Sequence, residues 1–301
     1  MLNVLKKSCS TIGNLRHCMI AVSHYSTNKS TPTDFGFKEV PWDEKQTLVG
    51  QVFSSVASSY DIMNDLMSGG LHRLWKDRLV ETLRPFPGMK HLDVAGGTGD
   101  VAFRVLRALR QVELSAKSRP SMQSSTSSST QLVPGSVVVC DINPSMLEEG
   151  KKKAEKEHDL KSDPGLSFEE SNAENLQQFS DASFDSYTIA FGIRNVSDRA
   201  AALREAHRVL KPGGRFLCLE FSQVKQRGLK ELYDMYSFNV IPRIGGIVAN
   251  DSASYQYLVE SIRTFPDQET FAQMMEEAGF KAVTFENHLS GIVAIHSGFK
   301  L

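Results

Sequence analysis

Short apolar runs alternate with amphipathic segments over most of the chain. The apolar runs have the length and composition of strands and lie at residues 91–95, 137–140, 166–170, 184–191 and 215–221. Between them, apolar residues recur at helical spacing over residues 101–114, 144–158 and 198–210. Strands that alternate with helices are typical of βαβ units, so the pattern predicts a mostly parallel sheet with helices on its faces.

The end of the chain departs from this alternation. A helix predicted over residues 267–278 ends at Gly279, and two apolar runs follow at residues 282–285 and 291–296 with no helix between them. Consecutive strands without a crossover helix form an antiparallel hairpin. The sequence therefore predicts an α/β fold in which a doubly wound, mostly parallel seven-stranded sheet ends in an antiparallel hairpin.

Two segments lack this pattern and are expected to lie outside the packed core. Residues 1–33 contain four Lys and Arg residues and five serines but no acidic residue. This is the composition of an organelle transit peptide, and the alternative is a tail without a targeting role. Residues 115–136 are rich in serine and have little to bury, so we expect a disordered insertion within one domain that spans residues 34–301.

The composition limits the classes of protein that remain. Among 301 residues, 34 Lys and Arg balance 35 Asp and Glu, which gives a formal net charge of −1. A dedicated nucleic-acid binder would carry a basic surface, so this class is not expected. No apolar stretch approaches the roughly 18 residues of a membrane-spanning helix. The four cysteines form no C-x-x-C pair, and neither a disulfide framework nor a metal site is predicted.

A glycine-rich turn follows the first predicted strand. Gly97 and Gly99 stand where this strand gives way to a helix, and glycine there lets a ligand approach the backbone closely. Residues 97–102 match the dinucleotide fingerprint G-x-G-x-x-G/A, but this match is weak by itself and also suits a nicotinamide cofactor or a plain turn. Asp93 and the C-terminal hairpin favour S-adenosylmethionine, whose amino-acid end Asp93 would reach through water.

Polar residues also follow the second and third predicted strands. Asp141 ends the second strand, where a carboxylate can accept hydrogen bonds from both hydroxyls of a ribose. Its alternative role is to cap the helix that begins at Pro144, although Asn143 could be the cap instead. Asn172 and Ala173 follow the third strand, where an amide can bond the edge of an adenine and a small neighbour leaves room for the ring.

Longer motifs resemble one family of enzymes. Residues 60–75 (YDIMNDLMSGGLHRLW) and 208–222 (RVLKPGGRFLCLEFS) resemble the two signatures of the ubiquinone/menaquinone biosynthesis C-methyltransferases. Further motifs at residues 93–100, 191–196 and 250–262 follow the order found in that family. The resemblance extends from about residue 53 to the C terminus, apart from the serine-rich insertion.

The resemblance implies a fold, a reaction and a setting. The fold is the Rossmann-like fold of class I S-adenosylmethionine-dependent methyltransferases. The reaction is C-methylation of a polyprenylated methoxy-benzoquinol in ubiquinone biosynthesis, with donor-binding positions at Thr98, Asp141, Asn172 and Ala173. Together with the N-terminal composition, it implies a mitochondrial protein, peripheral on the matrix side of the inner membrane. Other ubiquinone-biosynthesis proteins are the implied partners, in a multi-subunit complex, and a homodimer is a further option.

Carbon methylation requires a ring that has lost a phenolic proton, whose ordinary pKa is about 10. Arg194 follows the fourth predicted strand, where its charge could hold a phenolate or orient a water that takes the proton. Asn195 could fix the second oxygen, and a structural ion pair is the alternative role for Arg194. Asp251 is the third catalytic candidate. Further polar candidates are Asp61, Asn64 and His72, although a lone histidine is more often structural.

The remaining apolar segment bears on the choice among functions. Residues 229–248 are rich in large apolar side chains, so they could line a groove for an isoprenoid tail, face a membrane or form a dimer contact.

Three functions stay open on the residues alone: a C-methyltransferase, a nicotinamide-dependent oxidoreductase and a non-catalytic scaffold of a quinone-synthesis assembly. The donor motifs and the C-terminal hairpin favour the first.

Overall fold

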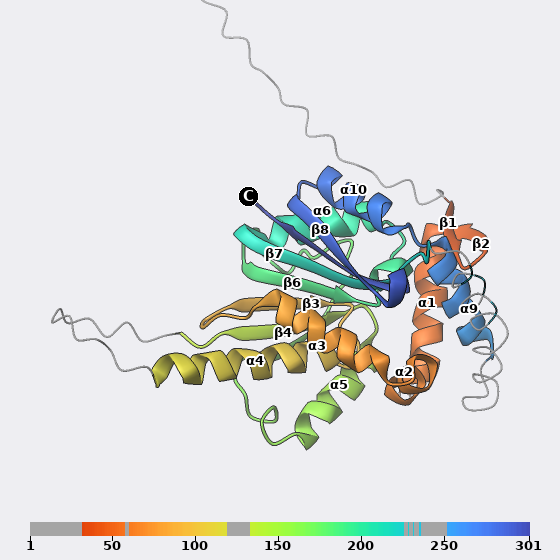
Figure 1. Ribbon diagram of the computed structural model, residues 1–301. Helices are drawn as coiled ribbons and strands as arrows, with labels where there is room; N and C mark the ends of the chain where they lie inside the picture. Colours follow the sequence, from red (N-terminus) through yellow and green to blue (C-terminus); the bar gives the residue numbers. More distant parts are fainter. Residues whose placement is uncertain are drawn as a thin grey trace, which may run out of the picture.

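The computed structural model describes residues 32–57, 60–118, 133–225, 228, 231, 235 and 252–301. At its centre is a seven-stranded sheet of order β5-β4-β3-β6-β7-β9-β8 (Figure 1). Its strands are β3 (Lys90–Val94), β4 (Ser136–Asp141), β5 (Leu166–Glu170), β6 (Phe184–Ala190), β7 (Leu210–Phe221), β8 (Lys281–His288) and β9 (Val293–Phe299). Only β9 in this sheet is antiparallel to its neighbours, β7 and β8, and the other pairs are parallel. The predicted fold class is confirmed, including the terminal hairpin.

Helices cover both faces of the sheet (Figure 1). One face carries α3 (Leu71–Leu83), α4 (Asp100–Lys117) and α5 (Pro144–Lys156), and the other carries α6 (Arg199–Val209) and α10 (Gln268–Glu277). Along β7, Leu217 and Leu219 enter the first core, whereas Phe216 and Cys218 enter the second. All four side chains are 0% exposed. Burial on both faces explains why this strand reads as a continuous apolar run rather than an alternating one.

Several elements near the two ends of the chain extend this core. They are the hairpin of β1 (Pro32–Phe35) and β2 (Lys38–Pro41), the helices α1 (Trp42–Val56) and α2 (Tyr60–Ser68), and α9 (Ser252–Thr264). Helices α1, α2 and α9 gather at one end of the sheet (Figure 1). The sequence pattern did not predict these elements. It did not predict α3 either, although Trp75, Leu79 and Leu83 of that helix recur every four residues and are buried.

The predicted elements of the sheet domain are confirmed with shifted ends. Helix α4 continues to Lys117, so its last turn occupies the start of the predicted serine-rich insertion. Strand β7 begins at Leu210, earlier than predicted, because Leu210 pairs with Phe184 ahead of the Pro-Gly-Gly sequence. The predicted insertion also ends too late, because its last residue, Ser136, begins β4. Three predicted features fall largely or wholly outside the described residues: the transit peptide, residues 119–132 of the insertion and most of the apolar segment 229–248.

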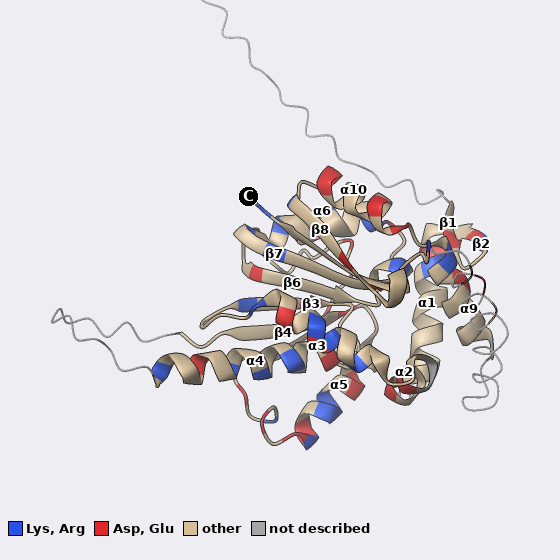
Figure 2. Ribbon diagram, viewed as in Figure 1, with Lys and Arg blue, Asp and Glu red and all other residues tan. Residues whose placement is uncertain are grey.

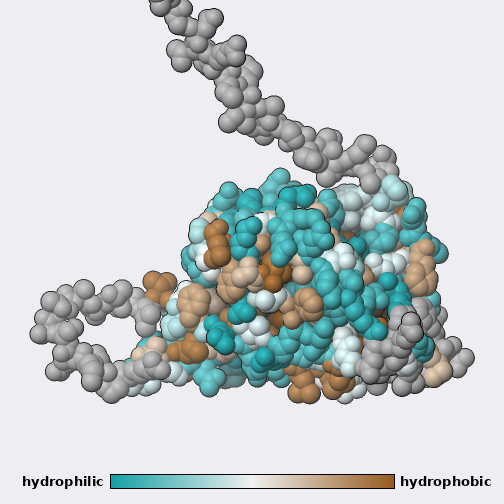
Figure 3. Space-filling view, turned by 45° about the horizontal axis from the view of Figure 1, so that its top comes forward, coloured by the Kyte–Doolittle hydropathy of each residue, from teal (hydrophilic) through white to brown (hydrophobic). Residues whose placement is uncertain are grey.

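The surface carries charges of both signs. Lys, Arg, Asp and Glu lie side by side along α3, α4 and α5 (Figure 2). On the face drawn in Figure 3, hydrophobic side chains reach the surface as separate patches among hydrophilic ones. None of the helices in the described ranges is long and apolar enough to cross a bilayer.

Asn143 joins α5 to α1. Its side-chain oxygen accepts hydrogen bonds from the backbone nitrogens of Ser145 (2.9 Å) and Met146 (3.3 Å) and so caps α5. Its amide nitrogen donates to the Gly50 carbonyl (3.1 Å) and to Ser54 Oγ (3.0 Å), both on α1. Asn143 is therefore the cap that the sequence left undecided, and the same amide fixes α1 across the end of the sheet.

Replacing Asn143 should separate these two contributions. We expect Asn143→Ala to lower the free energy of unfolding by about 1–2 kcal/mol, because it removes a helix cap and the partner of buried groups. Asn143→Asp is the matched control, since a carboxylate caps the helix but cannot donate to α1, and it should recover only part of the loss. Urea unfolding of the three proteins measures this. Equal stability of Asn143→Ala and the wild type would contradict the assignment.

Candidate active site

Three adjoining cavities lie at the carboxyl ends of the parallel strands. The strand-end cavity, of about 770 Å³ including its mouth, is lined by α1 and by residues that follow β3, β4 and β5. The helical cavity, of about 630 Å³, lies among α1, α2 and α9. The turn cavity, of about 370 Å³, lies at the glycine turn and the start of α4. Tyr60 and Phe191 line all three, so the cavities meet at these two side chains.

The strand-end cavity brings together four of the predicted donor-binding residues: Gly97, Asp141, Asn172 and Ala173. Asp141 Oδ2 accepts a hydrogen bond from the Gly97 nitrogen at 2.9 Å, and its Oδ1 accepts one from the Asn143 nitrogen at 2.9 Å. Each carboxylate oxygen has further acceptor capacity. Burial raises the pKa of Asp141 to about 6, because its charge is poorly solvated there.

The strand-end cavity also contains one residue that the sequence did not single out. Asn172 is held by a local turn in which its Oδ1 accepts from the Glu174 nitrogen at 2.9 Å. Gln46 reaches the same cavity from α1, and its buried Nε2 has no hydrogen-bond partner among the described residues. Because α1 was not predicted as an element, no local signal identified Gln46. The cavity thus offers an unused donor in addition to the predicted residues.

Asp93 and Gly99 hold the glycine turn in place beside the turn cavity. Asp93 accepts hydrogen bonds from Thr188 Oγ1 (2.6 Å) and from the Ala102 nitrogen (3.1 Å), and burial raises its pKa to about 7. Gly99 caps α4 with a φ of +83°, and a Cβ added there would lie 2.7 Å from the Phe103 ring. The turn therefore requires glycine at this position.

Thr98 and Lys76 also line the turn cavity. Thr98 Oγ1 lies 2.9 Å from Lys153 Nζ and 3.3 Å from Asp61. The hydroxyl of this residue, which was predicted to bind the methyl donor, is therefore hydrogen-bonded to side chains of α2 and α5. Lys76 was missed by the sequence reasoning. It is 6% exposed and lies 2.8 Å from Asp100. A buried cation beside a partly exposed carboxylate suits a ligand group that carries both charges.

Arg194 lies in the helical cavity within a buried ion pair. Its Nη1 donates to Glu220 Oε1 at 2.9 Å and to the Phe191 carbonyl, and the two charged residues are 3% and 1% exposed. The ion pair that was its alternative role is therefore present, with a partner that the sequence did not identify. The Nε of Arg194 is buried and has no hydrogen-bond partner in the described part of the chain. The Nε–H group is thus available to a ligand oxygen.

The other catalytic candidates are distributed differently. Asn195 lines the strand-end cavity rather than the helical one, and its Oδ1 accepts from the Tyr257 hydroxyl at 3.0 Å. Asn64 and His72 line the helical cavity, whereas Asp61 pairs with Lys153. Asp251 lies outside the described residues. Among the residues described, no group of three or more His, Cys, Asp or Glu could hold a metal ion.

The backbone is unusual at the same edge of the sheet. Ala95 and Phe191 follow the adjacent strands β3 and β6 with φ values of 50° and 55°. Non-glycine residues rarely adopt this left-handed region, and such strain is concentrated at functional sites. Both residues line the strand-end cavity, which agrees with the placement of a ligand site there.

Known proteins resemble this chain in sequence and in fold. The model of the ubiE/COQ5 methyltransferase family matches residues 41–300. The mitochondrial 2-methoxy-6-polyprenyl-1,4-benzoquinol methylase of Oryza sativa subsp. japonica is 58% identical over 278 residues, which cover 92% of each chain. The protein of that name from Homo sapiens is 53% identical over 285 residues, covering 91% of this chain and 86% of its own.

Solved structures share the fold at low identity. A SAM-dependent methyltransferase from Thermotoga maritima superposes with a TM-score of 0.53 and 18% identity, covering 83% of this chain and 99% of its own. At this identity the likeness concerns the fold alone. The family match, by contrast, covers most of the chain, and the relatives are more than half identical over nine-tenths of it. The chain therefore belongs to the ubiE/COQ5 methyltransferase family.

Proposed function

We propose that this chain transfers a methyl group from S-adenosylmethionine to a ring carbon of a polyprenylated methoxy-benzoquinol in ubiquinone biosynthesis. The names of relatives at 53–58% identity support this substrate class. The observation that carries the proposal is that three cavities meet at Tyr60 and Phe191: one lined by Asp141 and Asn172, one lined by charged groups at the glycine turn, and one that is largely apolar. Membership in a methyltransferase family removes the case for a nicotinamide-dependent oxidoreductase.

The strand-end and turn cavities suit the methyl donor, which supplies a methyl group activated on a sulfonium. Asp141 would accept hydrogen bonds from the ribose hydroxyls, and Asn172, Ala173 and Gln46 would surround the adenine. The amino-acid end carries both an ammonium and a carboxylate. It would lie in the turn cavity, where Lys76 and Asp100 offer the opposite charges and Asp93 is within reach through water.

The helical cavity suits the quinol. Its lining is largely apolar and includes Phe53, Met63 and Phe221, so an aromatic ring and the start of an isoprenoid tail would be shielded from water. Because Arg194 is paired with Glu220, its contribution would be a directed hydrogen bond from Nε to the developing phenolate rather than a free charge. Asn195 stays a candidate from the neighbouring cavity.

The setting of the enzyme follows from the same substrate. Ile62 and Leu74 are 61% and 64% exposed on α2 and α3, the helices that wall the helical cavity. Apolar side chains beside the site of a prenylated ligand would favour a peripheral contact with the matrix side of the inner membrane. We also propose that the enzyme assembles with other ubiquinone-biosynthesis proteins in a multi-subunit complex, with a homodimer as a further option. Residues 1–33 would direct the chain to mitochondria, as the names of the relatives suggest.

Asp141 provides a test of the donor site. Asp141→Ala should weaken S-adenosylmethionine binding by about 1–3 kcal/mol, the scale of lost hydrogen bonds to a charged group. The wild-type affinity should also decrease as the pH falls through about 6, because protonation removes the charge that the ribose hydroxyls bind. Calorimetric titration from pH 5 to 8 measures both effects.

Asp141→Asn is the matched control for the pH effect. It should lack the decrease near pH 6 but retain any effect of Asp93, whose pKa is about 7. Unchanged affinity in a folded Asp141→Ala protein would disprove the ribose assignment.

Arg194 provides a test of the acceptor site. Arg194→Lys keeps a cation beside Glu220 but lacks the Nε donor, so kcat should fall by about 10²-fold while donor affinity changes little. The defect should shrink at high pH, where the quinol ionises without help. Single-turnover rates against pH, with a short-tailed benzoquinol under anaerobic conditions, measure this.

A second variant controls for folding, since Arg194→Ala would leave Glu220 buried without its partner. Arg194→Gln combined with Glu220→Gln removes both charges and keeps a neutral hydrogen-bonding pair. A pH-independent defect, or a loss confined to donor binding, would show that Arg194 is structural only.

The targeting proposal is tested with a reporter protein. Residues 1–34 fused to a fluorescent reporter should direct it into mitochondria and be removed on import, because residues 1–33 are basic and acid-free, as in segments that are imported and cleaved. Microscopy and immunoblotting of the reporter report both events, and a fusion whose basic residues are replaced by Ala is the control. A diffuse, full-length reporter would count against a transit peptide.

A further inference from the structure

His72 is a buried histidine to which the proposed reaction assigns no role so far. It lies in the first turn of α3, is 5% exposed and lines the helical cavity together with Arg194. Its Nε2 lies 2.8 Å from Asp65 Oδ1. Its Nδ1 is buried and has no hydrogen-bond partner within the described ranges. The ring therefore has one nitrogen engaged by a carboxylate and one nitrogen unused.

Asp65 determines which nitrogen carries the proton. Arg73 donates to both oxygens of this carboxylate, at 2.8 Å and 2.6 Å. These hydrogen bonds hold the pKa of Asp65 below its ordinary value, so the carboxylate is ionised and can only accept. Nε2 of His72 must then be the donor, and the neutral ring presents a bare lone pair at Nδ1.

Burial keeps the ring of His72 neutral. The charged groups around it are Asp65 from α2, Lys76 on its own helix and Asp100 from α4. Arg194, which is paired with Glu220, lines the same cavity. Burial, followed by Lys76, lowers the pKa of His72 more than the two carboxylates raise it. At neutral pH the imidazole is thus uncharged and able to accept a proton.

The helical cavity then contains a complementary pair of unused groups. Arg194 Nε is a buried donor and His72 Nδ1 a buried acceptor, and neither has a partner among the residues that the structure describes. The surrounding wall is largely apolar, with Val52, Phe53 and Val56 from α1. Buried polar groups are ordinarily satisfied, so these two call for a ligand that both donates and accepts. A phenolic hydroxyl does both, first as a donor and then, once ionised, as an acceptor.

We propose that His72 is the general base of the methylation and takes the proton of a quinol hydroxyl at Nδ1, with Asp65 as its positioning residue. This inference rests on the proposed function. The O–H bond breaks, and Asp65 stabilises the imidazolium that forms. The ring carbon next to the phenolate bonds to the methyl group as the methyl–sulfur bond breaks, and that electron pair stays on sulfur. The same carbon then loses its hydrogen to water as a proton, which restores the aromatic ring, and His72 returns its proton to the oxygen.

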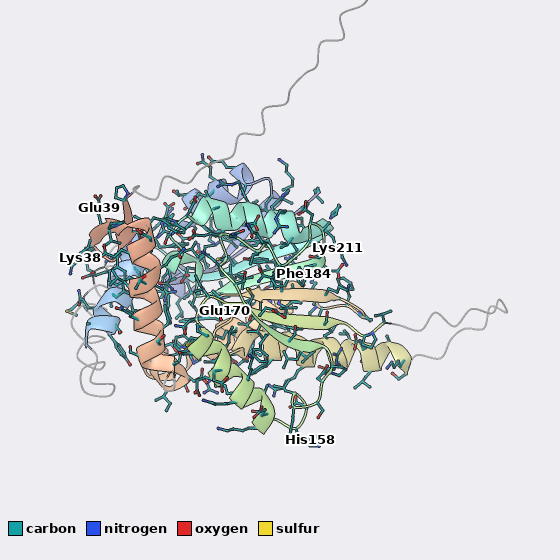
Figure 4. All side chains as sticks on the ribbon, turned by 180° about the vertical axis from the view of Figure 1, so that it is seen from behind. Lys38, Glu39, His158, Glu170, Phe184 and Lys211 are labelled. Atoms are coloured by element: carbon teal, nitrogen blue, oxygen red, sulfur yellow. The ribbon has the colours of Figure 1, made fainter. Side chains whose placement is uncertain are left out.

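His72→Gln is the first test, because a glutamine amide can keep the hydrogen bond to Asp65 but cannot act as a base. Single-turnover methylation of a short-tailed benzoquinol should be about 10²–10⁴-fold slower. The affinity for S-adenosylmethionine should stay within twofold of the wild type. The control is His158→Gln, the same change at an exposed histidine beyond the C-terminal end of α5 (Figure 4), which should leave the rate unchanged.

The pH profile and chemical rescue separate a base from a structural residue. S-adenosylmethionine is kept saturating at every pH, so that protonation of Asp141 or Asp93 does not limit the rate. The wild-type rate should then fall on the acidic side as His72 becomes protonated, below the ordinary histidine value of about 6.5. His72→Gln should lack this acidic limb, and its defect should shrink at high pH. In His72→Ala, added imidazole should restore part of the rate.

Two results would overturn the proposal. One is an acidic limb that persists in His72→Gln. The other is a slow His72→Ala enzyme that imidazole does not accelerate, since this would make His72 structural. Failure of the wild type to methylate any benzoquinol would instead contradict the proposed function, so the wild-type measurement distinguishes the two failures.

Discussion

Buried carboxylates at one edge of the sheet are the interaction on which the rest of the site depends. Asp141 is the last residue of β4, and Asp93 and Glu220 are the second-last residues of β3 and β7. The three side chains are buried, with Asp93 and Glu220 1% exposed and Asp141 9% exposed. Burial raises the pKa of each, and each is stabilised by hydrogen bonds from elsewhere in the fold. These bonds attach the start of α4, the glycine turn and the loop of Arg194 to the sheet. The charges that are costly to bury thereby fix the loops that line the three cavities.

The elements around the core complete this edge. Lys45 of α1 is 0% exposed and hydrogen-bonds Asp34 of β1 (3.3 Å) and the Val196 carbonyl (3.2 Å), next to Arg194 and Asn195. Burial lowers the pKa of Lys45 to about 8. This buried cation holds the first turns of α1 on the sheet domain, and Asn143 holds the later turns. The helix that closes the strand-end cavity is thus held by specific polar contacts as well as by apolar packing.

The helical cavity offers a ligand oriented hydrogen-bonding groups rather than a net charge. Arg194 is balanced by Glu220, and the ring of His72 is neutral, so the cavity carries little uncompensated charge. What remains is one oriented donor and one oriented acceptor in a largely apolar wall. Such preorganised groups are most effective for a charge that develops only during a reaction, because they need no rearrangement at that moment.

The sequence by itself determined the sheet elements and the residues at their carboxyl ends. Gly97, Asp141, Asn172 and Ala173 could be predicted to meet because parallel strands bring these ends to one edge, whatever the details of packing. The sequence did not reveal that Glu220 pairs with Arg194 or that Gln46 and Lys76 reach the cavities. It also left open which of two residues caps α5. These features depend on side chains from separate elements approaching within hydrogen-bond distance, and periodicity records only which face of an element is buried. Only the tertiary structure decides which distant polar groups are buried next to one another. A buried charge is unfavourable in free energy unless it has such a partner, so these pairings determine which charges can be buried.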